Sequence, residues 1–263
     1  MRLKALSLWG RYAMISLRAQ MQYRASFWAL LIASVVLHSA EFFGIWALFD
    51  RFGQIRGWSL AEIGVCYGLC GIAFALAEGL GRGFDAFANM TRYGHFDRLL
   101  LRPLSTEFQV AAQEVQLMRL GRLVQASVVL LVSLSWLNVD WSPSIVLLLI
   151  WCLVGGFCAF YGLLIVQATI CFWTIESLEA MNAITYGGVE TAQFPLTIYR
   201  DGFRRFFTFV VPVAGMNYLP VTYLVGKGGG WEVWCAPLLG AAFLIVALRF
   251  WRFGASKYAS TGS

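Results

Sequence analysis

The sequence predicts an all-α integral membrane protein with six transmembrane helices, an N-terminal amphipathic interfacial helix and a short cytoplasmic helix between spans 2 and 3. Of the 263 residues, 59% are hydrophobic and 13% are charged, about half the charged share of ~25% in soluble domains. The apolar residues form six long runs, most of them near the ~20 residues that cross ~30 Å of hydrocarbon. These runs are continuous rather than alternating, which argues against a transmembrane β-barrel.

Each run has a definite place in a single membrane domain that covers residues 1–263, because too little polar sequence remains for a second domain. The first run follows a polar segment and no small-residue cleavage site comes after it, so we expect a retained span rather than a signal peptide. The spans are predicted at residues 26–49, 60–81, 120–138, 144–172, 206–225 and 232–250.

Residues 1–25 are expected to form the interfacial helix. Lys4, Arg11 and Arg18 recur every seven residues on one face, and Trp9 lies roughly opposite them. A basic helix with Trp on its apolar side is typical of a helix that lies in the headgroup plane of a membrane.

Residues 82–119 are the main predicted cytoplasmic loop, and they contain a short amphipathic segment. Gly94 can break the chain before this segment, and Pro103 can end a helix after it. At helical spacing the apolar side holds Phe96, Leu99 and Leu100, and the charged side chains that mostly point elsewhere are Asp97, Arg98 and Arg102. Such a helix is suited to dock into a groove on a soluble partner.

Two later segments are irregular. Residues 174–205 are too polar to span freely, and we expect them at the inner membrane face, or as a broken segment that lines a polar cavity. Span 5 contains two prolines and a glycine within nine residues, which makes a straight helix improbable. A broken span exposes backbone groups that are useful along a translocation path, so its candidate path residues are Pro212, Asn217, Tyr218 and Pro220.

The distribution of basic residues predicts the orientation. Of the 20 Lys and Arg residues, 17 fall on one side of the six-span arrangement, and only Arg51, Arg56 and Lys227 fall on the other. The positive-inside rule then places both termini in the cytoplasm. Because these residues are dispersed along membrane boundaries, they do not form the basic face that nucleic-acid binding requires.

Ionisable side chains inside the spans are candidate functional groups, because they are costly at membrane depth. His38 and Glu41 lie three residues apart in span 1, where they could form a substrate or proton site, or a structural polar pair. Glu78 could pair with Arg82 at i,i+4, which we interpret as a structural contact.

No catalytic motif is present in the chain. There is no G-x-x-x-x-G-K-[ST] nucleotide loop, no H-E-x-x-H and no G-x-S-x-G, and two histidines cannot form a multi-histidine metal site. We therefore expect a non-enzymatic protein with no catalytic, cofactor or metal site of its own.

The order of these elements resembles the permease subunits of bacterial type-2 ABC exporters, in the branch of about 260 residues whose permeases occur in pairs. Two motifs carry the resemblance, G-x-F-D-x-L-L-L-R-P-L-S at residues 94–105 and P-x-x-x-x-N-Y-x-P at residues 212–220. The branch usually has Glu or a similar polar residue directly after the glycine, and this chain has His95 there.

The resemblance implies that the permease and the ATPase are separate chains. The segment between spans 2 and 3 would be a coupling helix that contacts a separate P-loop ATPase through Gly94, His95, Phe96, Asp97, Arg98, Leu99, Leu100, Arg102 and Pro103. Phe96 and the leucines would fill an apolar groove of that ATPase. ATP and Mg²⁺ would bind the ATPase, which would be present in two copies.

The resemblance also implies a second, non-identical six-span permease in a bacterial cytoplasmic (inner) membrane, with lipids around the pair. The competing hypothesis is a stand-alone secondary transporter or channel that uses His38 and Glu41 for ion coupling. The apolar spans fit many transported molecules and do not identify a substrate.

Overall fold

The computed structural model describes residues 2–114, 116–137, 139–174, 178–212 and 214–258, and within them every regular element is helical. In chain order the α-helices are α1 (Arg2–Met21), α2 (Arg24–Phe52), α3 (Leu60–Asp85), α4 (Phe87–Arg92), α5 (His95–Leu100), α6 (Thr106–Gln113), α7 (Leu120–Trp136), α8 (Pro143–Ile170), α9 (Leu178–Ala192), α10 (Asp201–Arg205), α11 (Ala214–Leu224) and α12 (Glu232–Lys257). Shorter helical turns are η1 (Leu117–Arg119), η3 (Leu196–Ile198) and η4 (Phe206–Val210), the last a π-helix.

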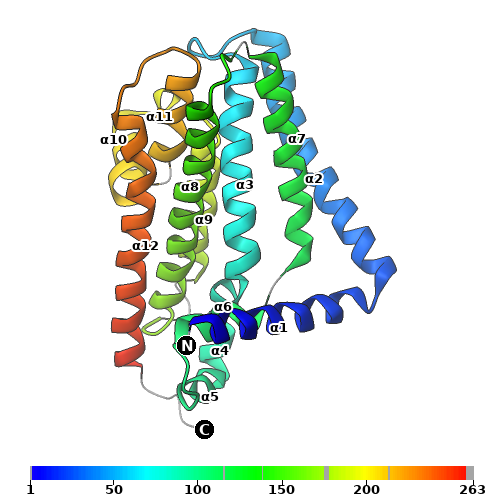
Figure 1. The fold of residues 1–263 in the computed structure, drawn as a ribbon, viewed down its shortest axis with the longest axis vertical. Helices are drawn as coiled ribbons and strands as arrows, with labels where there is room; N and C mark the ends of the chain where they lie inside the picture. The colour runs from blue at the N-terminus through cyan, green and yellow to red at the C-terminus, as the bar shows by residue number, and fades with distance from the viewer. Residues whose placement is uncertain (1, 115, 138, 175–177, 213, 259–263) are drawn as a thin grey trace.

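The long helices run side by side along the molecule, and α1 lies crosswise at one end, next to α6 (Figure 1). Among the described residues, four helices are long and apolar enough to cross a membrane, namely α2, α3 with its extension into α4, α8 and α12. The helix α7 is also apolar but has only 17 residues. The all-helical membrane architecture is thus confirmed, whereas six full spans are not.

The centre of the bundle is α3, which is buried along most of its length and packs against α7 and α8. Glycines on one side of α3 bring α7 very close. A Cβ atom added at Gly68 would lie 2.6 Å from Cβ of Leu130, and one at Gly71 would lie 2.7 Å from Cβ of Ala126. The glycines of α3 therefore allow close packing against α7.

The structure places residues 178–205, the described part of the segment 174–205 beyond Thr174, differently from the expectation of an inner-face segment. The helix α9 runs beside α8 toward the end of the molecule opposite α5 (Figure 1). There Thr197 accepts hydrogen bonds from Trp58 Nε1 at 3.0 Å and, through its backbone oxygen, from Arg56 at 2.8 Å. The segment can lie within the bundle because Val189 and Ala192 are buried against α3 and α8, and its polar groups find partners there.

Residues 206–225 also differ from the expected span. The π-helix η4 leads into α11, whose 11 residues cover about 16 Å, roughly half of the hydrocarbon thickness. The helix α11 packs in the half opposite α5, where the Tyr218 ring lies 6.0 Å from the Trp58 ring. The chain therefore enters and leaves on the same side here, as a re-entrant segment, with Pro220 inside the short helix.

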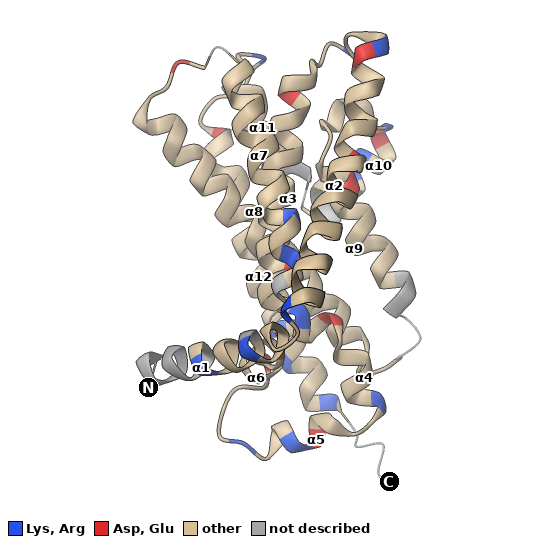
Figure 2. Ribbon diagram, turned by 90° about the vertical axis from the view of Figure 1, so that its right-hand side faces the viewer, with Lys and Arg blue, Asp and Glu red and all other residues tan. Residues whose placement is uncertain are grey.

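This rearrangement changes the distribution of charge. Arg200, Arg204 and Arg205 follow the contact at Thr197 and belong to the half opposite α5. Moving these three leaves 14 of the 20 basic residues on the α5 side. Figure 2 shows Lys and Arg along α1 and around α4 and α5, so the asymmetry persists.

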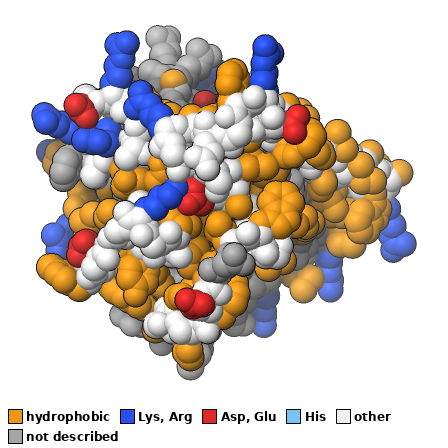
Figure 3. Space-filling view, turned by 90° about the horizontal axis from the view of Figure 1, so that it is seen from above, with side chains coloured by type: hydrophobic (Ala, Val, Ile, Leu, Met, Phe, Trp, Pro, Cys, Tyr) orange, Lys and Arg blue, Asp and Glu red, His pale blue; other side chains and the backbone are white. Residues whose placement is uncertain are grey.

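The end opposite α5 is closed by polar contacts around Lys227. Its ammonium donates to Glu62 and to the backbone oxygen of Gly57, each at 2.6 Å, and it lies 4.3 Å from the Trp58 ring centre. Glu62 also completes a capping box with Ser59 at the start of α3. Seen from this end, charged side chains of both signs lie among hydrophobic ones (Figure 3).

We predict that Gly83→Ala destabilises the junction of α3 and α6. A Cβ atom at residue 83 would lie 1.8 Å from the backbone oxygen of Val110, so a helix must shift, at a cost of about 1–3 kcal/mol. The measurement is the thermal unfolding midpoint in detergent. Gly79→Ala, one turn earlier, is the matched control because nothing lies within 4 Å of its added Cβ. Equal midpoints for the two variants would contradict this packing.

Candidate functional site

The short helices α4, α5 and α6 form a platform at the basic end of the bundle. Gly94 joins α4 to α5 with a φ of 66°, in the left-handed region that side chains disfavour, so glycine allows a tight turn here. Since α4 follows α3 after a single residue, Ala86, the platform is attached directly to the central helix.

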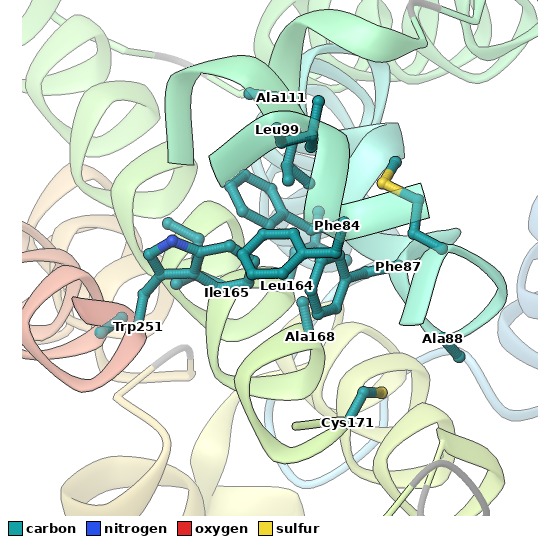
Figure 4. Close-up of a cluster of buried hydrophobic side chains, with 14 residues drawn as sticks. Phe84, Phe87, Ala88, Leu99, Ala111, Leu164, Ile165, Ala168, Cys171 and Trp251 are labelled. Carbon is teal, nitrogen blue, oxygen red and sulfur yellow. The ribbon is translucent and has the colours of Figure 1, made fainter. Parts of the chain in front are cut away.

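The platform is held to the bundle by an aromatic cluster. Phe96 on α5 is fully buried and packs edge-on to Phe87, with ring centres 5.2 Å apart. Phe87 in turn meets Trp251 of α12 at 4.9 Å. Figure 4 shows Phe84, Phe87, Leu99 and Trp251 converging with residues of α8. Edge-to-face pairs add to the hydrophobic gain from burial, so α5 is firmly fixed.

Hydrogen bonds reinforce this attachment. The Gln109 amide on α6 donates to the backbone oxygens of Leu99 at 3.0 Å and Leu104 at 2.9 Å, which fixes the turn after α5. The Trp251 indole donates to the Thr106 hydroxyl at 3.0 Å, at the start of α6. The platform is thus tied to α12 as well as to α3.

The structure corrects the expected direction of the apolar side chains in α5. Phe96 and Leu99 are 0% and 2% exposed within this chain, so they cannot fill a groove on another protein in this conformation. The outward apolar residues are Leu100 and Leu101, 47% and 86% exposed. The surface around them carries Tyr93, His95, Arg98, Arg102 and Pro103, whereas Gly94 and Asp97 are half-buried.

Above the platform, a carboxylate is buried inside the bundle. Glu78 on α3 is fully buried, and its Oε1 lies 2.7 Å from Arg119 Nη2 and accepts a hydrogen bond from the Tyr186 hydroxyl at 3.1 Å. Arg122 Nη1 lies 3.9 Å from the other carboxylate oxygen, and its guanidinium lies 5.0 Å from the Phe74 ring centre. One acidic residue therefore joins α3, η1, α7 and α9.

The expected Glu78–Arg82 pair is wrong. Arg82 instead pairs with Asp85, one turn further along α3, because Glu78 faces the two arginines at the start of α7. Asp85 continues the polar network, since it accepts a hydrogen bond from Gln167 of α8 at 3.2 Å. Gln167 also donates to Asn182 at 2.7 Å and accepts from Thr185 at 2.8 Å, both on α9.

His38 and Glu41 of α2 differ in exposure and in hydrogen-bond partner. His38 is buried, and its Nδ1 donates to the backbone oxygen of Ser34 at 2.7 Å. Glu41 is exposed and accepts a hydrogen bond from Gln193, just after α9, at 3.1 Å. Each side chain is hydrogen-bonded to another residue, so the structure shows two neighbouring polar groups rather than one hydrogen-bonded pair.

The candidate path residues of the re-entrant segment lie inside the bundle. Pro212 and Pro220 are buried, Tyr218 is half-buried against Trp58, and Asn217 is 2% exposed with neither amide atom hydrogen-bonded. They do not line an open surface of this chain.

Sequence reasoning used Arg119 and Arg122 only as markers of orientation and did not single out Tyr186 or Gln167. One feature of the sequence could have indicated that Glu78 pairs with these two arginines. Two arginines three residues apart share a helix face at the start of a span, and the preceding span carries a lone Glu78 at a similar depth. The contribution of α9 could not be found this way because its position depends on the whole bundle.

These features define a polytopic α-helical membrane protein with a polar network above a platform at its basic end. The family model for the ABC-2 family transporter protein matches residues 35–262. The chain therefore belongs to this family and is a type-2 ABC permease, a membrane component of an ABC transporter. Searches of curated proteins and of solved structures found no match.

We predict that Glu78→Gln strongly destabilises the protein. The change removes the negative charge that compensates two arginines at a buried position, and breaking such a contact costs about 3–5 kcal/mol. Glu107→Gln is the control, because its partner Arg252 is 70% exposed and such pairs contribute about 0–1 kcal/mol. Thermal unfolding midpoints in detergent compare the variants, and a loss no larger than that of the control would contradict the structural role of Glu78.

Proposed function

We propose that this chain is one of two permease subunits in an ATP-driven exporter, and that it couples to a separate ATPase through the α4–α6 platform. Membership of the ABC-2 family supports a transporter with an ATPase partner. The observation that carries the coupling proposal is the outward surface of α5 and the following turn, where Leu100 and Leu101 are exposed among basic residues.

The platform has the properties of a docking element. Its inward side chains, Phe96 and Leu99, are buried in the protein's own core, so the outward surface of the platform is held in a fixed geometry. An apolar pair flanked by Arg98 and Arg102 suits a groove with an apolar floor and an acidic rim. Motion of such a partner would pass to the bundle as a rigid-body shift, since α4 continues from α3.

The polar network above the platform is the proposed route of coupling. Asp85, at the platform end of α3, contacts α8 through Gln167, and Gln167 contacts α9. Glu78 connects the same α3 to α7 and again to α9 through Tyr186. A tilt of α3 must therefore move α9 or break buried hydrogen bonds, which is costly in a bilayer.

The basic end of the molecule is proposed to face the cytoplasm of a bacterial inner membrane, with α1 in the headgroup layer. The excess of Lys and Arg on the α5 side supports this orientation. ATP and Mg²⁺ would bind the ATPase subunits, present in two copies, because this sequence contains no P-loop motif.

The surface formed by α2 and the end of α9 is proposed to face a second permease and the translocation path. Glu41 lies near the middle of α2 and is exposed in the single chain, as is Glu190 of α9. Carboxylates at this depth are expected to face water or protein rather than lipid. A partner permease, with a polar path between the two chains, satisfies that requirement.

We predict that Leu101→Asp releases the ATPase while the protein stays folded. Leu101 is 86% exposed, so the change costs little stability, but it places a charge in the centre of the proposed docking surface. The control is Trp231→Asp, also at an exposed apolar residue (78%), beyond the far end of the bundle. The measurement is the amount of ATPase that co-purifies from native membranes in mild detergent.

Retention of the ATPase by the Leu101→Asp protein would disprove the docking surface. Recovery of the wild-type chain without any ATPase would move the assignment to the alternative, a stand-alone transporter that uses His38 and Glu41. Phe96→Ala is a useful third variant, because it should lower the unfolding midpoint before it affects the contact surface.

We predict that a cysteine at residue 41 crosslinks to the second permease. In a Cys235→Ser background, which removes the exposed native cysteine, Glu41→Cys labelled with a maleimide–benzophenone photocrosslinker should give an intermolecular product after illumination. Leu131→Cys on α7, an exposed position at 68%, is the control on another face. Equal yields from both positions, measured by gel and mass spectrometry, would contradict the proposed interface.

A further inference from the structure

A cavity of about 280 Å³ lies between α2 and α7, away from the platform. Its volume is nearly twice that of an engineered ~150 Å³ cavity that binds benzene. The walls are almost entirely apolar, with Val35, Phe42, Val128, Val132 and Trp136 among them. Among the residues that the structure describes, no charged side chain lines the cavity, which disfavours an ionic ligand.

One amide side chain, that of Gln125, belongs to this wall. Gln125 of α7 is 5% exposed, and neither its amide nitrogen nor its oxygen makes a hydrogen bond of ordinary geometry. Its polar neighbour Tyr67 donates to the backbone oxygen of His38 at 3.3 Å and also interacts with the Gln125 side chain. A buried amide without a hydrogen bond of ordinary geometry is costly, so a ligand with an uncharged donor or acceptor that reaches it would be stabilised here.

The cavity opens toward the lipid-facing surface of the two helices. Phe43, Val124 and Val128 belong to its wall and are more than half exposed. The helix α2 leans away from the bundle along α7, which leaves this surface open in the single chain (Figure 1). A hydrocarbon chain can thus enter sideways from the membrane.

We propose that this cavity binds an uncharged lipid of the surrounding bilayer, from the leaflet on the α5 side. Gln125 lies five residues after the start of α7, about 8 Å along the helix, where a hydroxyl or ester group of such a lipid would meet the amide. Its acyl chain would run along α7 toward Trp136, about 16 Å further. The proposal concerns binding alone and does not depend on the direction of transport.

The test uses the full chain in lipid nanodiscs with a photoactivatable monoacylglycerol that carries a diazirine in its acyl chain. After illumination, mass spectrometry should locate the label on α2 and α7 at several times the level on the lipid-facing side of α12. A fatty acid with the same diazirine chain is the charged comparison, and we expect it to label these helices less.

Two variants separate the cavity from the lipid annulus. Val128→Trp fills the cavity and should lower labelling of α7 at least fivefold, whereas Val36→Trp, at an exposed residue of α2 outside the cavity, should not. Gln125→Leu removes the amide and should weaken binding of the monoacylglycerol about threefold to tenfold, but not that of a diazirine alkane.

Three results would overturn the proposal. Labelling that Val128→Trp leaves unchanged would mean general contact with lipid. A photocrosslinker at residue 128 that captures another protein chain would mean that a protein covers this face. Labelling of the assembled transporter that disappears during ATP turnover would identify cargo rather than a resident lipid. These outcomes are independent of whether the ATPase co-purifies.

Discussion

The buried charge of Glu78 constrains the whole bundle. A carboxylate fully removed from water is tolerated only where cations and hydrogen-bond donors surround it, and here they come from η1, α7 and α9. Its three partners, at residues 119, 122 and 186, are all far from residue 78 in sequence. The helices that carry them cannot move independently of α3 without exposing a charge to an apolar interior.

The same helix connects that constraint to the platform. The chain passes from α3 into α4 after one residue, and the aromatic cluster around Phe96 and Trp251 fixes α5 against α8 and α12. The platform is thus a rigid extension of the membrane helices rather than a flexible loop. This rigidity is what a subunit needs if it is to receive mechanical work from a soluble partner, and family membership implies such a partner.

Away from these contacts, the helix α2 packs against the rest of the bundle over only a small part of its surface. That helix contacts α7 and η1 but leaves most of its surface uncovered, including Glu41 on one side and the cavity with Gln125 on another. The two surfaces differ in chemistry. The carboxylate requires protein or water, whereas the apolar cavity with its single amide suits an uncharged lipid.

Some features could be predicted from the sequence alone because they depend on local pattern. Continuous apolar runs fixed the helical membrane class, and the basic residues predicted an asymmetric molecule. Gly94 and Pro103 marked the limits of the platform helix correctly to within a few residues, since turn and helix-breaking preferences are local. The motifs at residues 94–105 and 212–220 resembled the type-2 ABC permeases, and the family match bears this out.

Other features were decided only by tertiary structure. Helical spacing placed Phe96, Leu99 and Leu100 on one face, but it could not say that Phe96 and Leu99 pack inward while Leu100 stays exposed. Polarity predicted that residues 174–205 lie at the inner membrane face or line a polar cavity, and only the packed fold places α9 within the bundle, where Glu78 and Gln167 satisfy its polar groups. Likewise Glu78 pairs with Arg119 rather than with Arg82. Partners of buried polar groups come from distant segments, and only the packed fold brings them together.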